Sequence, residues 1–270
     1  MTDLRGRDAV LGALVADAAS LGLHWLYDVD RIASVVGDGH AAFMPIDPKY
    51  FEGVAGYFAH GQRADGASSQ YGECLWLACD TIVDGRFDVA AYQAAFAAHF
   101  GPGGTYTGYI DRPTRGALDN IAQEVSPTGI DDDQLPAITR LPAVVAYGAP
   151  EDIMLAIEVT NVNTVAAEYG KVFAALLGAV IDGTAISDAL AAAAAGHPDL
   201  EAALAAPDPD SVAYGEITGR ACHLPMAMPL IFHILARATD YRDAVERNIR
   251  AGGDSCGRAI IIGSVMGAAY

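Results

Sequence analysis

The chain has 270 residues, of which 52% are hydrophobic and only 19% are charged, and its formal net charge is −18 at pH 7. A chain of this length and apolar content can bury a sizeable core, which excludes a globally disordered protein. The negative charge repels phosphate groups, so the composition argues against broad binding to nucleic acid or to an anionic membrane surface.

The N-terminal part of the chain combines an apolar helix with a long irregular segment. Apolar residues recur with helical spacing over residues 5–25, which predicts a mostly buried helix with Asp17 in its middle. Residues 29–69 are rich in Gly, Pro, Asp and His, and we expect a long loop with short helical pieces. Irregular stretches of this length are usually functional. His40 and His60 are candidate substrate contacts there, or simply parts of a polar loop.

The remainder of the chain is predicted to be helical. The expected helices span residues 73–83, 87–100, 112–124, 135–147, 151–157 and 161–181, then alanine-rich segments, then 226–237, 241–250 and 255–270. A glycine-rich loop at 101–108 and an acidic turn at 127–133 separate some of them. No alternating pattern is long enough to predict a strand. The sequence therefore predicts an all-α fold in one domain over residues 1–270.

Targeting and cysteine patterns add three expectations. No basic segment precedes an apolar stretch at the N-terminus, so no secretory signal is visible. The longest weakly charged stretch, residues 259–270, is too short to span a bilayer. The cysteines form no CxxC pair, which gives no support to a zinc ribbon. We expect a cytoplasmic protein with reduced thiols and no membrane or nucleic-acid partner.

The last predicted helix gives the clearest local signal. Asp254 and Ser255 follow two glycines at its start, which is typical of an N-cap. Glycines at 257, 263 and 267 leave one flank of the helix nearly bare, so it can pack very closely, and we expect it to be central. A buried carboxylate needs a partner, and Arg258, four residues further on, could reach Asp254.

A second polar segment, Ser68-Ser69-Gln70-Tyr71-Gly72-Glu73-Cys74, leads into another apolar helix. Taken alone, it is typical of helix capping. Together with Ala16-Asp17-Ala18 and Gly252-Gly253-Asp254-Ser255, however, it resembles the motifs of the ADP-ribosylglycohydrolase family. The family's opening G-D-A, central T-D-D-T-Q and closing G-G-D-T-D-T segments stand at these three places. The segments at 108–111, 139–142 and 222–229 follow in the expected order, so the resemblance covers nearly the whole chain.

The resemblance implies an all-α fold with a cleft for ADP-ribose and two magnesium or manganese ions that orient the ribose and activate water. The ligand set in this chain is incomplete, because Cys256 and Gly257 replace an Asp and a Thr of the closing motif. Asp254 and Glu73 are the candidate ligands if a metal is retained, with Asp17 or Asp111 as supplements, but two hard cations need many oxygen ligands. Arg258 could stand in for a metal, and a purely structural polar network is the other alternative.

These considerations select the candidate site. The predicted catalytic residues are Asp254, Glu73 and Asp28, of which Glu73 or Asp28 could act as general base. The predicted substrate contacts are His24, Trp25, Tyr27, Gln70, Tyr71, Tyr109, Asp111, Ser255 and Arg258. The expected activity is hydrolysis of an ADP-ribosyl or related N- or O-glycosidic bond, in a small molecule or an ADP-ribosylated substrate, with no requirement for the two-metal centre. The alternative is an inactive member of the fold that binds ADP-ribose or a nucleotide, or has a structural role.

Overall fold

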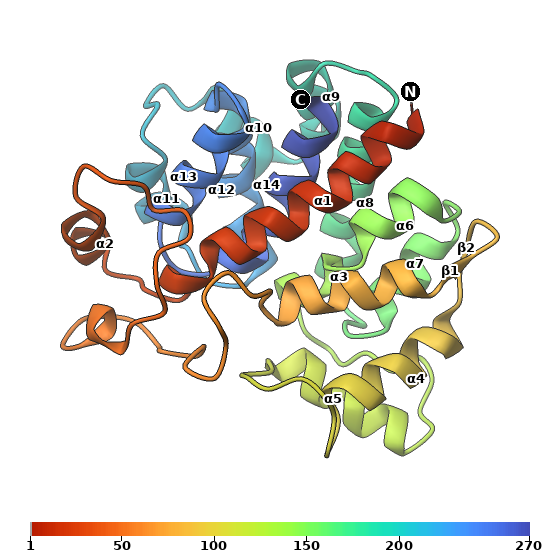
Figure 1. Cartoon of the computed structure of the whole chain (residues 1–270). Coiled ribbons are helices and arrows are strands. Elements are labelled where there is room, and N and C mark those ends of the chain that lie inside the picture. Colours follow the sequence, from red (N-terminus) through yellow and green to blue (C-terminus); the bar gives the residue numbers. More distant parts are fainter. Residues whose placement is uncertain (1) are drawn as a thin grey trace.

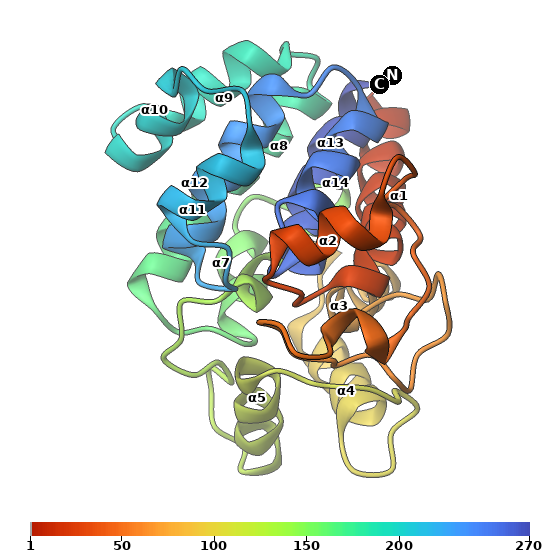
Figure 2. The same ribbon diagram turned by 90° about the vertical axis from the view of Figure 1, so that its left-hand side faces the viewer.

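The first and last helices of the chain lie side by side, with the last helix inside the molecule and the first along one of its faces (Figures 1 and 2). The computed structural model describes residues 2–270, with side chains from Leu4 onward. Helix α1 (Thr2–Ser20) packs along α14 (Ser255–Ala269). Every residue of α14 from Ser255 to Met266 is buried. The prediction of a central last helix is therefore confirmed.

Glycines allow these two helices to approach backbone to backbone. A Cβ atom on Gly12 would lie 2.2 Å from the carbonyl oxygen of Gly263, and one on Gly263 would lie 2.4 Å from the carbonyl oxygen of Gly12. Real side chains do not tolerate such distances, so the pair depends on the bare flank seen in the sequence. The close contact fixes the start of α14 next to the end of α1, where the polar residues gather.

The other helices pack around the remaining sides of α14 and confirm the all-α prediction. The helices in contact with α14 include α3 (Gln70–Asp80), α6 (Leu141–Tyr147), α8 (Thr164–Ile181), α12 (Leu224–Arg237) and α13 (Tyr241–Arg250). An outer group on the α12 side comprises α9 (Ile186–Ala194), α10 (Pro198–Ala205) and α11 (Ser211–Thr218). On the α3 side lie α4 (Val89–Phe100) and α5 (Arg112–Ala122), while α7 (Asp152–Glu158) packs on α6 and α8. One 3-10 turn, η3 (Leu135–Ile138), replaces the first part of the helix predicted over 135–147.

A short hairpin is the part of the fold that the sequence prediction missed. Strands β1 (Ile82–Val83) and β2 (Arg86–Phe87) pair antiparallel. Asp84 and Gly85 join them with positive φ angles of 51° and 75°. An Asp-Gly pair is a strong signal for such a turn. Strands of two residues are nevertheless too short to show an alternating pattern, so the helix predicted to end at 83 ends at Asp80 instead.

The long irregular segment has the expected form and lies beside the ends of the central helices. It contains two short helices, α2 (Val29–Val36) and the 3-10 turn η2 (Pro48–Phe51), and the 3-10 turn η1 (Leu21–Leu23) precedes it. A bridge between Leu26 and Gly56 folds the segment back on itself. This fold brings residues 57–60 next to the residues that follow α1.

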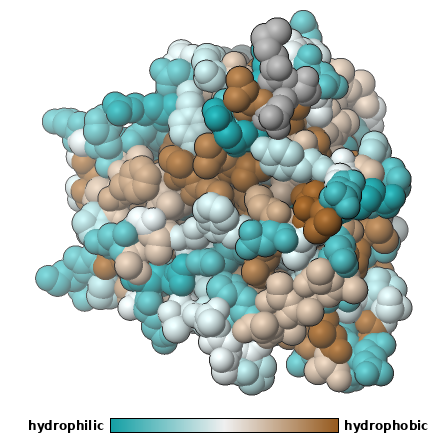
Figure 3. All heavy atoms as spheres, turned by 45° about the vertical axis from the view of Figure 1, so that its right-hand side comes forward, coloured by the Kyte–Doolittle hydropathy of each residue, from teal (hydrophilic) through white to brown (hydrophobic). Residues whose placement is uncertain are grey.

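The molecule exposes apolar side chains on one face and contains one long apolar helix. Apolar side chains gather in a band across the face shown in Figure 3, and on α1 the side chains of Leu4, Leu11 and Val15 are exposed at helical spacing. Among the described residues, α8 is the one helix long and apolar enough to cross a membrane by length and composition. This helix is longer than the weakly charged stretch at 259–270 that the sequence analysis considered. However, 56% of it is buried inside the molecule, as in a core helix.

Candidate active site

Four chain segments bring their polar residues to one small cavity. Its volume is about 10 Å³, room for roughly one water molecule. Asp111 caps α5, the segment 69–71 starts α3, residues 24–25 follow η1, and His60 belongs to the long loop. The cavity is lined by His24, Trp25, His60, Ser69, Gln70, Tyr71, Tyr109 and Asp111.

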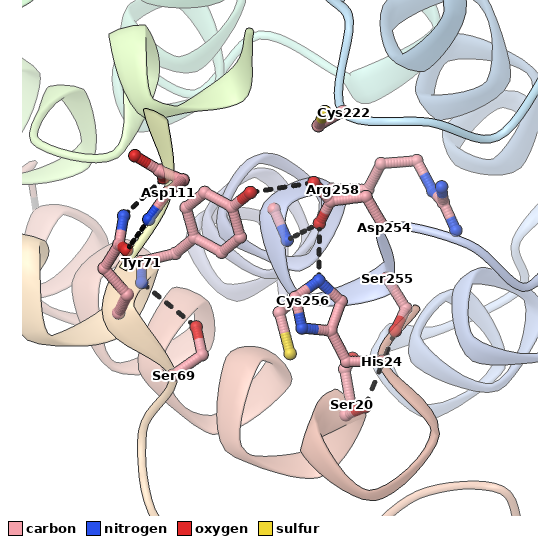
Figure 4. A network of polar contacts seen from close by, with 12 residues as sticks. Ser20, His24, Ser69, Tyr71, Asp111, Cys222, Asp254, Ser255, Cys256 and Arg258 are labelled. Atoms are coloured by element: carbon pink, nitrogen blue, oxygen red, sulfur yellow. Dashed lines mark hydrogen bonds and ion pairs between the residues drawn. The ribbon is translucent and has the colours of Figure 1, made fainter. Parts of the chain in front are cut away.

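Asp254 lies behind the cavity wall and connects two of its residues (Figure 4). Its carboxylate caps α14 by accepting from the Gly257 N–H at 2.9 Å, and it accepts from the Tyr71 hydroxyl at 2.8 Å and from His24 Nε2 at 2.9 Å. Burial alone would raise the pKa of Asp254, but the His24 ring and these hydrogen bonds together hold that pKa below its usual value. Asp254 is therefore a buried carboxylate that stays ionised.

The two glycines before Asp254 set its position. Gly252 and Gly253 have φ angles of +74° and +67°, which favour glycine. A Cβ atom on Gly253 would lie 2.0 Å from the carbonyl oxygen of Arg220. The backbone can thus turn tightly into α14 while the Gly253 carbonyl accepts from the Trp25 N–H at 2.8 Å.

His24 and His60 form a chain of hydrogen bonds that begins at Asp254. His24 Nδ1 lies 2.6 Å from His60 Nε2, and the rings stack with centroids 4.9 Å apart. Asp254 accepts from the Nε2–H of His24. In the neutral form of His24, Nδ1 accepts and His60 donates from Nε2. His60 Nδ1 then carries a lone pair, and it is a buried atom with no hydrogen-bond partner among the described residues. Burial lowers the pKa of His60 to about 2, so its ring is neutral.

Two further buried carboxyl groups belong to the site. Asp111 accepts from the Thr114 N–H at 2.7 Å and from the Gln70 side-chain amide, whose oxygen accepts from the Asp111 N–H at 2.7 Å. Burial raises the pKa of Asp111 to about 6. Asp17 accepts from the Ser69 N–H at 2.8 Å and from the Ser69 hydroxyl, and burial raises its pKa to about 7. Both groups can hold a proton near neutral pH, unlike Asp254.

Aromatic side chains lie on one side of the cavity, where Trp25 and Tyr109 form part of its wall. Trp25 lies edge-on to Tyr109 with ring centroids 4.8 Å apart, and Tyr57 contacts both rings at 5.8 Å and 5.7 Å. Trp25 has a φ of 64°, a strained conformation for a bulky residue, and its carbonyl accepts from the Tyr57 N–H. We call Trp25, Tyr57 and Tyr109 the aromatic cover, and a ligand larger than water does not fit the cavity with Trp25 and Tyr109 in these positions.

The predicted substrate contacts divide into two groups. Those that line the cavity are His24, Trp25, Gln70, Tyr71, Tyr109 and Asp111. Ser255 is fully buried and its hydroxyl donates to the Ser20 carbonyl at 3.5 Å. Tyr27 is half-buried near Asp254 and is not one of the cavity-lining residues. The sequence thus located most of the cavity wall.

Two of the predicted catalytic carboxylates have other partners. Glu73 forms an ion pair with Arg63 and a hydrogen bond with His99 Nε2 at 3.1 Å. Asp28 caps α2 by accepting from the Arg31 N–H at 2.8 Å. Neither residue lines the cavity, and Asp254 reaches it through His24 and Tyr71.

The expected contact between Arg258 and Asp254 is corrected by the structure. The fully buried guanidinium of Arg258 donates to the Asn248 side chain at 2.9 Å and to the carbonyls of Gly252 and Arg220. Asn248 and Gly252 lie at and just beyond the C-terminal end of α13, where carbonyls lack helical partners and attract a cation, and Arg220 follows α11. His24 and Tyr71 take the place of Arg258 beside Asp254. Burial lowers the pKa of Arg258 to about 10.

The site residues do not fit a pair of hard divalent ions. No group of three or more His, Cys, Asp or Glu side chains within residues 4–270 is arranged to hold a metal. Both Asp254 oxygens already accept hydrogen bonds, and Glu73 is paired with Arg63. At the position of the family's second Asp stands the buried thiol of Cys256, whose sulfur is a poor ligand for such ions.

His60 and Tyr57 are the site residues that the sequence did not single out for this role. His60 was a candidate contact in a polar loop, 36 residues from His24. Nothing in the local pattern shows that two histidines so far apart stack on each other. Only the fold-back of the long loop at Leu26 and Gly56 brings them together.

The fold is all-α, and the N-terminal ends of α3, α5 and α14 meet at a small polar cavity. These two features define the structural class of the protein. A family model described as ADP-ribosylglycohydrolase matches residues 2–270, and the chain belongs to this family. Crystallin J1A of Tripedalia cystophora is 28% identical over 98% of this chain and 88% of its own length. Crystallin J1B of the same organism is 28% identical over 38% of this chain and 30% of its own length. A solved structure described as an ADP-ribosylglycohydrolase-related protein complex superposes with a TM-score of 0.65 at 18% identity, covering 100% of this chain and 88% of that chain.

Proposed function

We propose that this protein hydrolyses a glycosidic bond of an ADP-ribosyl or related glycosyl group by acid–base chemistry, without the two-metal centre. One observation carries the proposal. The carboxyl of Asp111, with a pKa near 6, lines the same cavity as a neutral histidine, while Asp254 beside it stays ionised. Environments that push the pKa values of neighbouring groups apart are typical of acid–base active sites.

Asp111 has the properties of the acid. A protonated carboxyl can donate to the leaving atom of the glycosidic bond as that bond breaks. Gln70 and the Thr114 N–H fix the orientation of this carboxyl, and burial keeps it protonated in part near neutral pH. The aromatic rings of Trp25 and Tyr109 offer faces for a sugar or a nucleobase once the cover opens.

A specific observation also favours the non-catalytic alternative. The cavity of about 10 Å³ holds no sugar in this conformation. A relative that covers nearly the whole chain carries the name crystallin and not that of a hydrolase. A protein that binds ADP-ribose on its aromatic cover without cleaving it would be consistent with both facts.

Measuring substrate turnover in the presence of a chelator distinguishes the hydrolase from the binding protein. The purified protein is incubated with 4-nitrophenyl ADP-ribose and with an ADP-ribosyl-arginine peptide, each with EDTA or with magnesium. The proposal predicts that ADP-ribose is released at the same rate with EDTA as with magnesium. Thermal stabilisation by ADP-ribose with no release from any substrate would instead support the binding protein, and release that requires magnesium would contradict the metal-independent mechanism.

A further inference from the structure

We propose that the cavity holds the attacking water of the hydrolysis, and that Nδ1 of His60 is the atom that removes its proton. This inference rests on the proposed function and adds the base to it. It assigns His60 as a catalytic residue, and His24 and Asp254 as positioning residues behind it.

The unpartnered nitrogen is the first observation. His60 is only 4% exposed, and its Nδ1 is buried without a hydrogen-bond partner among the residues the structure describes. A buried acceptor without a partner is costly, so such atoms are nearly always satisfied by an ordered water or a ligand. His60 also lines the cavity, so this missing partner and the cavity belong to one place.

The size and lining of the cavity are the second observation. About 10 Å³ is near the lower limit for one ordered water, which needs two to four polar partners. Polar side chains of Ser69, Gln70, Tyr71 and Asp111 share the wall with His60. The cavity therefore fits one water and places it between a neutral imidazole and a carboxyl that can carry a proton.

The hydrogen-bond chain gives the removed proton a destination. Water loses a proton to His60 Nδ1 as its oxygen bonds to the anomeric carbon, and the glycosidic bond breaks with its electron pair on the leaving atom, which takes the proton of Asp111. With His24 neutral, the Nε2 proton of His60 passes across the 2.6 Å hydrogen bond to His24 Nδ1 in the same step, so the positive charge rests beside ionised Asp254 and not on buried His60. Proton exchange with solvent restores both groups, so the sum is one water added across one bond.

Two substitutions test the roles of the two ring nitrogens of His60 one at a time. The amide of His60→Asn lies near the place of Nδ1 but cannot reach His24, and the amide of His60→Gln reaches toward His24 but leaves the Nδ1 place empty. Neither amide can take a proton. We expect both variants to lose about 100-fold or more in kcat on 4-nitrophenyl ADP-ribose, with little change in KM. The structure places His40, the other histidine considered in the long loop, outside the cavity, where its exposed ring lies 3.6 Å from Glu246. His40→Ala is therefore the matched control and should keep wild-type kcat.

Chemical rescue distinguishes a base from a structural side chain. In His60→Ala, added imidazole should restore turnover in proportion to its free-base concentration, while His40→Ala should not respond. Circular dichroism and thermal unfolding confirm that each variant is folded. If wild-type protein turns over the substrate and His60→Asn keeps its kcat within about threefold, or imidazole rescues nothing, the inference is wrong and the proposed function stands. If wild-type protein shows no turnover, the proposed function fails and the inference fails with it.

Discussion

At the scale of single residues, the site separates three buried aspartates by their surroundings. Asp254 accepts from His24, Tyr71 and the start of a helix, and its pKa is lowered. Asp111 and Asp17 receive fewer compensating interactions, so burial dominates and raises their pKa to about 6 and about 7. The same side chain thus serves as a fixed negative charge in one place and as a proton carrier in another.

Asp17 makes stability depend on pH in a defined direction. A carboxyl with a raised pKa in the folded state favours the protonated form, so its stabilising contribution is complete below pH 3.8 and is lost as pH rises through about 7. Between pH 5 and pH 8 this loss is about 2 to 3 kcal/mol of unfolding free energy. Asp17→Asn should remove this decrease in unfolding free energy between pH 5 and pH 8, as measured by urea unfolding. Asp38→Asn, at an exposed loop position, should leave the pH dependence unchanged; equal slopes in both variants would show that Asp17 is ionised when folded.

At the scale of elements, the contact between α1 and α14 holds the site together, since one helix ends and the other begins at the polar cluster. Gly12→Ala places a Cβ atom 2.2 Å from the Gly263 carbonyl oxygen and must push the helices apart. We expect a loss of about 1 to 3 kcal/mol in unfolding free energy, despite the better helix propensity of alanine.

Gly178 in α8 provides the matched control for this prediction. A Cβ atom there meets its nearest heavy atom at 3.8 Å, an ordinary contact. Gly178→Ala should therefore stabilise the protein by about 0.5 to 1 kcal/mol. A Gly12→Ala variant as stable as Gly178→Ala would mean that the two helices are not in close contact.

The elements also show what the sequence can and cannot predict. Glycines at 257, 263 and 267 leave one flank of the last helix without side chains, and this pattern predicted that the helix packs closely against a neighbour. Asp254, at the start of that helix, was accordingly predicted to be a buried cap. The partner of Asp254 was mistaken, because local spacing favoured Arg258 four residues away while the real partners, His24 and Tyr71, are 230 and 183 residues distant. Contacts of this kind depend on how loops fold back, and no local pattern encodes them.

At the scale of the whole molecule, charge and shape set conditions on the substrate. A net charge of −18 opposes the approach of an anionic pyrophosphate. Arg115 offsets this field beside the aromatic cover, since its guanidinium lies 5.7 Å from the centroid of Tyr109, whereas Arg63 is already paired with Glu73. Access of the proposed substrate therefore depends on this local cation and on movement of Trp25, Tyr57 and Tyr109.

The identity of the leaving group tests the acid–base account most directly. Nitrophenolate leaves without needing a proton, whereas an alkyl alcohol does not. In EDTA, Asp111→Asn, which keeps a residue able to cap α5, should lose about 100-fold or more in kcat on an alkyl ADP-ribose glycoside and only a few-fold on 4-nitrophenyl ADP-ribose. Equal losses on both substrates, or wild-type turnover that stops when metal is removed, would contradict the assignment of acid–base catalysis to this cavity.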